Sequence, residues 1–212
     1  MKIAFPKFPK KTVRFAAAAS VLLATAVSSV KIIRTNEFGL QETTGVVTSG
    51  VKKPGVYFQV PFAQITHAYR GNTQTISFGA GSFRFFPWNH DTADKNILVA
   101  DVTINYKVIP DPIKLSFWRW AMEDWFAGAN GYWVLTEAAN TSANAALGRK
   151  TMAQTLSKPA VFAQDLYQDL SSRLEQNNIP IQVQSIELNG IRTTFWPAHT
   201  TQYIVVGSSP TP

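Results

Sequence analysis

The chain has 212 residues, enough for one ordinary domain or two small ones, and combines 45% hydrophobic residues with only 16% charged ones. The formal net charge is +7, but five of the 20 basic residues and no acidic residue precede residue 15, so the rest of the chain is nearly neutral. This pattern does not indicate a basic face for nucleic acid, and we expect no nucleic-acid partner. The chain contains no cysteine, which excludes disulfides, thiol catalysis and zinc sites that use thiolates.

An uncharged, mostly apolar segment follows the basic cluster. No charged residue occurs from Phe15 to Val30, and the segment reaches Ile33 if the Lys31 side chain extends toward the lipid headgroups. As a helix, residues 15–33 would span roughly 28 Å, close to the thickness of a bilayer core. We predict a basic cytoplasmic segment at 1–14 and a transmembrane helix at 15–33, with membrane lipid as a partner. The anchoring side chains would be Phe15, Val21, Leu22, Leu23, Val27, Val30, Ile32 and Ile33.

The positive charges before this segment favour a cytoplasmic N-terminus. The protein is then a single-pass protein of a bacterial inner membrane, with its body on the periplasmic side. A cleaved signal peptide is the alternative, because Phe15–Leu23 has the length of its apolar region and Ala24-Thr25-Ala26 matches a cleavage site. Under that alternative the body is an exported, monomeric periplasmic binding module.

The next part of the sequence is rich in predicted strands. Between residues 34 and 112, short apolar runs are broken by glycine and proline. The clearest strand is Ala100–Val108, where every second residue is apolar, so we expect one buried face. Residues 79–88 are rich in aromatic residues and glycine. Their rings either pack under the sheet or form an exposed tip that contacts lipid or a neighbouring subunit.

Two predicted helices follow. The first, residues 113–126, is rich in tryptophan, and the second, residues 134–147, has a stripe of alanine and serine that allows close packing. Clustered aromatic rings favour either a protein core or the membrane interface. The membrane-interface candidates, including those of the preceding aromatic stretch, are Phe85, Phe86, Trp88, Trp118, Trp120, Trp125 and Trp133.

A third helix and a returning strand complete the body. Ser157 is the expected N-cap of this helix, with Pro159 in its first turn, and apolar residues then recur every four positions from 162 to 174. The strand at 181–188 changes its apolar phase between Val183 and Ile186, which indicates a bulge. An antiparallel sheet followed by helices and a returning strand is an α+β fold, here on a single N-terminal transmembrane helix.

No motif for catalysis or cofactor binding is found. The three histidines, His67, His90 and His199, have no second histidine at the spacing of a metal site. Neither a nucleophile elbow nor a phosphate-binding glycine loop is present. We therefore expect no enzymatic activity, no metal and no cofactor.

Several stretches of the chain, in their order, resemble the stomatin/prohibitin/flotillin (SPFH, or band 7) superfamily. The most specific is Lys53–Phe62, which is similar to the proline-glycine strand motif of the family. The strand Val102–Val108 with Asp111-Pro112 after it, then Leu147–Arg149, and finally Val183–Arg192 follow in the family's order. The matching motif residues are Pro54, Gly55, Phe58, Pro61, Phe62, Asp111 and Pro112.

The resemblance implies both an architecture and a role. It divides the body into a strand-rich subdomain at 34–112 and a helix-rich subdomain at 113–192, followed by a short tail at 193–212. Members of the family assemble into rings or cages that enclose a patch of bilayer, and some bacterial members control a membrane AAA protease. The resemblance therefore implies a membrane-anchored scaffold that forms homo- or hetero-oligomers with SPFH-like subunits and organises a membrane patch or a membrane protein complex.

One stretch departs from the family pattern. After Arg192 the family continues with a long coiled coil, whereas residues 193–206 here are aromatic and β-branched and show no heptad repeat. We therefore expect a ring or arc formed by the folded domains alone.

Overall fold

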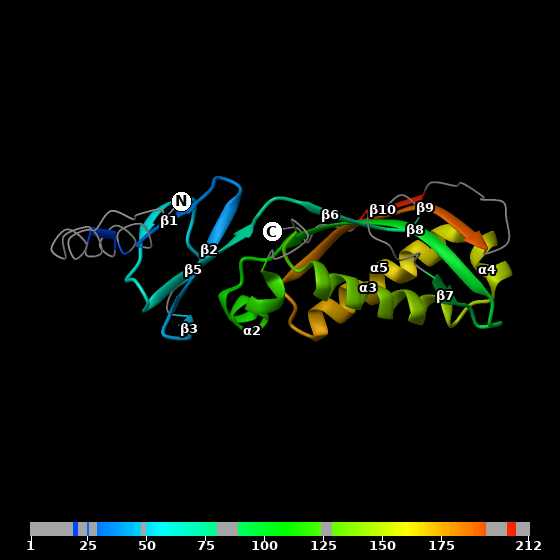
Figure 1. Cartoon of the computed structure of the whole chain (residues 1–212). Helices are drawn as coiled ribbons and strands as arrows, with labels where there is room; N and C mark the ends of the chain where they lie inside the picture. The colour runs from blue at the N-terminus through cyan, green and yellow to red at the C-terminus, as the bar shows by residue number, and fades with distance from the viewer. Residues whose placement is uncertain are drawn as a thin grey trace, which may run out of the picture.

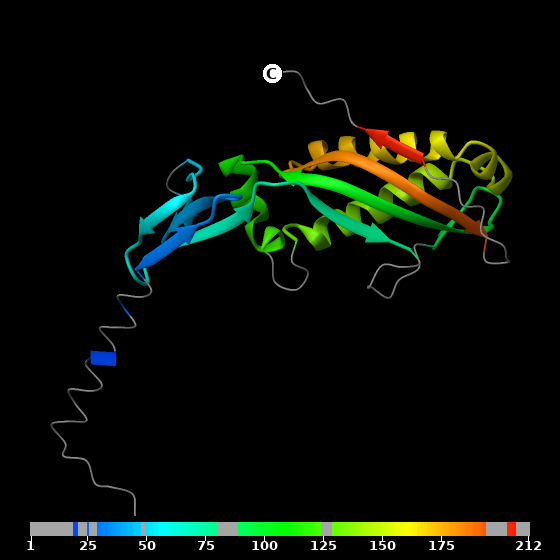
Figure 2. The same cartoon turned by 90° about the horizontal axis from the view of Figure 1, so that it is seen from above.

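The computed structural model describes residues 19–20, 25, 29–47, 50–79, 89–123, 129–193 and 203–206. Within them the protein is elongated and has two parts (Figure 1). A small strand-rich part lies near the N-terminus, and in the larger part helices cover one face of a long sheet. Figure 2 shows the two parts end to end.

The small part consists of five short strands: β1 (Val30–Ile33), β2 (Glu37–Thr43), β3 (Val46–Val47), β4 (Gly55–Phe58) and β5 (Gln64–Arg70). β2 pairs antiparallel with β5 along its whole length and with β3 at one end. β1 and β4 form a separate antiparallel pair. This pair packs on β2 through Ile33, whose side chain lies over Gly39, a position where any Cβ would collide with it.

The larger part is one antiparallel sheet with helices on one face. Its strands are β6 (Gln74–Phe78), β7 (Asn89–Asp91), β8 (Ile97–Val108), β9 (Ile181–Thr193) and β10 (Tyr203–Val206). β8 pairs with β6, β7 and β9, and β10 adds to the outer edge of β9. The helices are α2 (Pro112–Met122), α3 (Tyr132–Leu147), α4 (Met152–Ser157) and α5 (Pro159–Gln176). In Figure 1, α3 and α5 lie side by side beneath the sheet.

The core follows the periodicity of the sequence. The apolar residues of the predicted strand Ala100–Val108 are all buried in β8, and those spaced by four in 162–174 are all buried in α5, which confirms both elements. The bulge is confirmed as well, because the pairing of β8 with β9 passes from Ser185 to Val183 and skips one residue. Each fully buried leucine or phenylalanine contributes about 1.5–3 kcal/mol to the free energy of unfolding.

The third helix begins differently from the prediction. Thr151 and Gln154 form a capping box that starts α4, so Ser157 is the last residue of α4 and not the N-cap of the next helix. The Ser157 hydroxyl donates to the Gln154 carbonyl at 3.0 Å. Lys158 occupies the N-cap of α5 without a side-chain cap bond, and Pro159 stands in the first turn as expected.

The predicted end of the transmembrane helix is wrong. Val30–Ile33 form β1, because their backbone pairs with Gly55–Phe58 in an antiparallel ladder. Within the described part of the chain, no helix combines the length and the apolar character that crossing a bilayer requires. The other anchor residues, Phe15, Val21, Leu22, Leu23 and Val27, lie outside the described residues.

The sheet order places the boundary between the two parts earlier in the chain than residue 112. A boundary at residue 112 separates β8 from β9, yet these two strands pair along almost their whole length. β6, β7 and β8 therefore belong with the helices, and the two parts meet between Arg70 and Gln74. The predicted tail at 193–212 contains β10, a strand that the sequence analysis did not anticipate, and residues 207–212 lie outside the described residues.

Candidate membrane-facing surface

One face of the β1–β4 pair is apolar and exposed. The antiparallel register sets Val30 opposite Phe58 and Ile32 opposite Val56, so these four side chains share one face. Their exposed fractions are 40%, 79%, 64% and 61%, in that order. The other face of the pair carries Ile33, which is buried. Four large apolar side chains exposed side by side mark a surface that contacts something other than water.

A turn that carries Phe62 follows β4 and adds a further exposed apolar side chain. The amides of Ala63 and Gln64 donate to the Val60 carbonyl at 3.2 and 2.9 Å, and the Gln64 side chain accepts from the Val60 amide at 2.9 Å. Phe62 has a φ of 63°, which residues other than glycine rarely adopt, and its side chain is 99% exposed. We call the side chains of Val30, Ile32, Val56, Phe58, Val60 and Phe62 the β1–β4 apolar surface.

The family-like motif of the sequence builds this surface. Gly55 is the first residue of β4 and follows Pro54, Phe58 is the last, and Pro61 precedes Phe62 in the turn. Both phenylalanines of the motif are exposed, so burial in this chain does not account for them.

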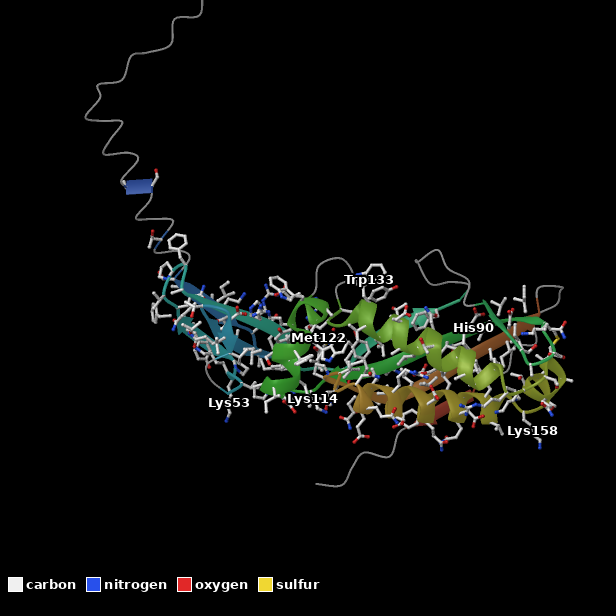
Figure 3. The ribbon with its side chains drawn as sticks, turned by 90° about the horizontal axis from the view of Figure 1, so that it is seen from below. Lys53, His90, Lys114, Met122, Trp133 and Lys158 are labelled. Carbon is white, nitrogen blue, oxygen red and sulfur yellow. The ribbon has the colours of Figure 1, made fainter. Side chains whose placement is uncertain are left out.

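Basic side chains lie in the loop before β4. Lys53 is exposed, and its carbonyl accepts a bond from the Tyr57 hydroxyl at 2.7 Å. The Lys52 ammonium lies 4.5 Å from the centre of the Tyr57 ring, a cation–π contact. Figure 3 shows Lys53 on the small part of the molecule. Tyr57 points to the face opposite Val56 and Phe58, so the Lys52 ammonium lies on that opposite face, and Lys53 is the exposed basic residue of this loop.

Of the three aromatic candidates that the structure describes, Trp118 and Trp133 line one groove, and Trp120 is not among its lining residues. Trp120 and Trp133 are exposed by 68% and 65%, on α2 and α3. Trp118 packs against the core, and its indole N–H donates to the Asn177 carbonyl at 3.3 Å. Trp133 lies in the larger part, away from Lys53 (Figure 3). Phe85, Phe86, Trp88 and Trp125 lie outside the described residues.

The second part of the motif starts α2. The Asp111 carboxylate accepts bonds from the amides of Ile113 and Lys114 at 2.9 and 3.1 Å, and Pro112 occupies the first turn. This cap fixes the rotation of α2, which buries Leu115 and Met122 and leaves its opposite face exposed.

A charged cluster, which the sequence analysis missed, joins the small part to α2. The His67 ring on β5 lies between the Glu123 carboxylate, 2.7 Å from Nδ1, and the Glu42 carboxylate, 3.3 Å from Nε2. Arg119 of α2 pairs with the same Glu42 carboxylate. These side chains are between 11% and 22% exposed, so solvent screens the pairs only partly. Both ring nitrogens of His67 thus lie within hydrogen-bonding distance of a carboxylate.

Asn130 is a second link between the parts. Its side chain accepts from the Arg70 amide at 2.8 Å and donates to the Met122 carbonyl at 2.9 Å. Its own amide donates to the Gln74 side chain at 2.8 Å, and its carbonyl accepts from the Tyr106 hydroxyl at 2.9 Å. Asn130 is 2% exposed and thus connects β5, β6, β8 and α2 inside the protein.

Two buried ionisable groups have displaced pKa values. Burial, assisted by the negative charge of Glu123, raises the pKa of the Tyr69 hydroxyl. Burial lowers the pKa of the His90 imidazole, against the opposing effect of its 2.8 Å hydrogen bond to the Asn144 side chain. Neither group lies in a metal site, since the described residues contain no cluster of three or more ligating side chains.

These features define an α+β domain whose exposed apolar face lies directly after its N-terminal segment. Comparison with protein families matches residues 31–194 to the SPFH domain / Band 7 family, and the chain therefore belongs to this family. Comparison with curated proteins finds no match. Members of the family are generally membrane-associated scaffolds that form oligomers, and generally not enzymes.

Proposed function

We propose that this protein is a membrane-anchored SPFH scaffold whose β1–β4 apolar surface rests in the lipid of the outer leaflet. The N-terminal segment crosses the inner membrane and ends before β1, with the basic residues of 1–14 in the cytoplasm and the body in the periplasm. Because Val30–Ile33 form β1, residues 15–29 would span roughly 22 Å as a helix, and local thinning of the bilayer would accommodate this short span. The single observation that supports this most is the exposed face of Val30, Ile32, Val56 and Phe58 with Phe62 beyond it. This exposed face begins at Val30, directly after the proposed membrane span.

The free energy of burying these side chains in lipid is of the size needed for a contact that the anchor already holds at the membrane. Burying an exposed phenylalanine contributes about 1.5–3 kcal/mol, so Phe58 and Phe62 are sufficient to orient a body that the anchor already holds at the bilayer. Lys53 adds attraction to anionic lipid of about 1 kcal/mol when it lies near the headgroups.

In this proposal the scaffold acts by assembly. Copies of the chain, alone or with SPFH-like subunits, form a ring or arc that organises a patch of membrane or a membrane protein complex. A membrane AAA protease is a candidate for the complex that it modulates. Family membership supports the assembly, and the protease is the more specific step of the proposal.

Site-specific fluorescence tests the lipid contact. The chain has no cysteine, so single variants Val60→Cys and Val161→Cys each accept one environment-sensitive label. Both valines are exposed, by 56% and 45%, and Val161 lies on α5 in the larger part, which makes it the matched control. The full chain is placed in vesicles of phosphatidylethanolamine and phosphatidylglycerol that contain a lipid-attached quencher. We expect quenching and blue-shifted emission at position 60 only. Equal behaviour at both positions would refute the lipid contact.

Native mass measurement tests the anchor and the assembly. We expect intact chains that begin before residue 15 and, in mild detergent, particles several times larger than the 23.4 kDa chain. A soluble species of single chains that begins near Val27 would instead support the exported monomeric binding module.

A further inference from the structure

α2 presents an apolar stripe outside the β1–β4 apolar surface. Ile113, Phe117 and Trp120 follow one another at intervals of four and three residues, so they lie on one side of the helix. Their exposed fractions are 79%, 87% and 68%. The Arg119 guanidinium lies 5.0 Å from the centre of the Trp120 ring and stiffens that end of the stripe. We call these three apolar side chains the α2 stripe.

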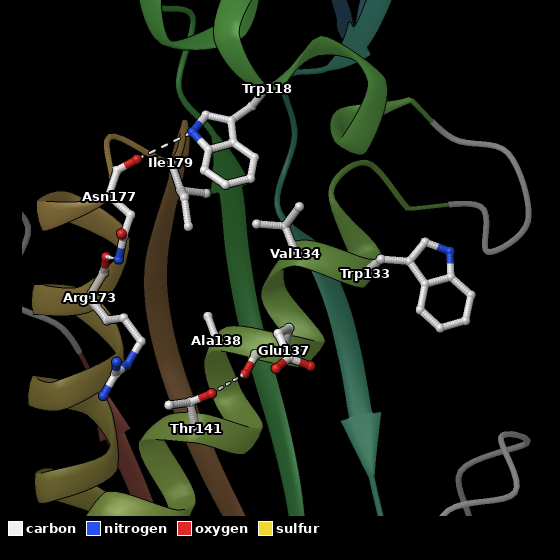
Figure 4. Close-up of a pocket in the computed structure, with 9 residues that line it drawn as sticks. All are labelled: Trp118, Trp133, Val134, Glu137, Ala138, Thr141, Arg173, Asn177 and Ile179. Atoms are coloured by element: carbon white, nitrogen blue, oxygen red, sulfur yellow. Dashed lines mark hydrogen bonds between the residues drawn. The ribbon is translucent and has the colours of Figure 1, made fainter.

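A groove opens elsewhere on the same group of helices. It lies between α2, α3 and the end of α5, encloses about 390 Å³, and is predominantly apolar (Figure 4). Trp118 forms one wall and is held there by its bond to Asn177. We call it the helical groove, and its lining residues are Trp118, Trp133, Val134, Glu137, Ala138, Thr141, Arg173, Asn177 and Ile179.

The two surfaces carry opposite charges. Lys114 directly follows the first residue of the α2 stripe, and Glu137 lies on the rim of the helical groove. The other charged residue of the rim, Arg173, is paired with Asp169 at 3.0 Å. No ion pair of Lys114 or Glu137 occurs within the described part of the chain. Lys114 lies about 100° around α2 from Ile113, so it flanks the stripe, and the groove carries a carboxylate on its rim.

We propose that the α2 stripe of one copy packs into the helical groove of a second copy, with Lys114 of the first against Glu137 of the second. The inference rests on the proposed self-assembly and names its contact surfaces. Lys114, which flanks the stripe, and Trp133, on the α3 wall of the groove, lie on opposite edges of the molecule in Figure 3. A contact between two different surfaces is heterologous, so each copy retains one surface for the next, and a ring or an arc follows.

Charge exchange tests the pairing. Lys114→Glu sets two carboxylates against each other, and Glu137→Lys sets two ammonium groups against each other. Each single change should raise the protein concentration needed for half-assembly by at least about tenfold, because like charges in contact cost more than 1.4 kcal/mol. The double variant Lys114→Glu/Glu137→Lys restores opposite charges and should restore assembly. Lys158→Glu, an exposed change at the far end of the molecule (Figure 3), is the matched control and should have no effect. Failure of the double variant to recover would overturn the pairing.

Cross-linking tests the contact independently of charge. Ile113→Cys places a thiol on the α2 stripe, and Thr141→Cys places one in the helical groove, in a chain with no other cysteine. A mixture of the two variants, oxidised in mild detergent, should give a disulfide-linked dimer, whereas either variant alone should not. Large wild-type particles without this cross-link would reject these surfaces and leave the proposed self-assembly standing. Wild-type protein that is monomeric would reject the self-assembly itself.

Discussion

Asn130→Ala should weaken the link between the two parts of the domain more than its size suggests. The change removes the acceptor of the Arg70 amide and the donor to the Met122 carbonyl, in a residue that is only 2% exposed. An unsatisfied buried polar group costs about 1–3 kcal/mol, so two such groups should lower the free energy of unfolding by about 2–6 kcal/mol. That is a large part of the roughly 5–15 kcal/mol of a typical domain.

Urea denaturation of the full chain in detergent, followed by tryptophan fluorescence, measures this loss. With a slope of about 2 kcal/mol per M, the midpoint should fall by about 1–3 M. Asn189→Ala is the matched control, because Asn189 makes one side-chain bond, to the Thr103 hydroxyl at 3.0 Å, on the outer face of the sheet. The free energy of unfolding of Asn189→Ala should fall by no more than about 0.5 kcal/mol, because water can replace the amide that bonds the Thr103 hydroxyl. Equal losses in the two variants would show that the buried bonds of Asn130 do not hold the parts together.

Two further variants test the packing and the titration of the larger part. Gly131→Ala should lower the free energy of unfolding by about 1–3 kcal/mol in the same assay, because φ is 73° and a Cβ would lie 2.7 Å from Met122 Sδ and 2.8 Å from Ile181 Cδ1. Gly50→Ala is the control and should be neutral, because a Cβ there would have nothing within 4 Å. Equal effects of the two variants would contradict the steric argument. The His90 imidazole has a pKa in the folded state below its ordinary 6.5. As pH falls from 6.5, the imidazole is therefore protonated in the unfolded chain before it is protonated in the folded chain, and the free energy of unfolding decreases. His90→Gln should remove the part of the decline that begins as pH falls through about 6.5, and an unchanged pH profile would reject the assignment.

Local patterns were enough to predict much of the larger part. The alternation in Ala100–Val108 and the four-residue spacing in 162–174 each determine which side chains are buried, because the geometry of one strand or one helix sets that face without reference to the rest of the chain. The same holds for Asp111, which caps α2 through bonds to amides two and three residues away. Ser157 failed as a cap prediction because Thr151, only six residues earlier, starts a separate helix.

The sequence predicted only part of the candidate surface. The motif from Pro54 to Phe62 resembles a family pattern, but nothing in the sequence predicted that its side chains are exposed. Val30 and Ile32 had been assigned to the helical anchor, since an apolar run at the end of a predicted span has the same composition as an edge strand. Pairing with Val56 and Phe58, more than 20 residues away, makes them a strand and places all four side chains on one exposed face.

The sequence by itself determined the α+β order, the buried faces of the long strand and helix, and the family. Tertiary structure alone decided which apolar residues stay exposed and which charges meet, as in the cluster of Glu42, His67, Arg119 and Glu123 from distant segments. The physical reason is that helix and strand periodicity act over a few residues, whereas strand register and helix docking bring together groups whose distance along the chain carries no information about their contact.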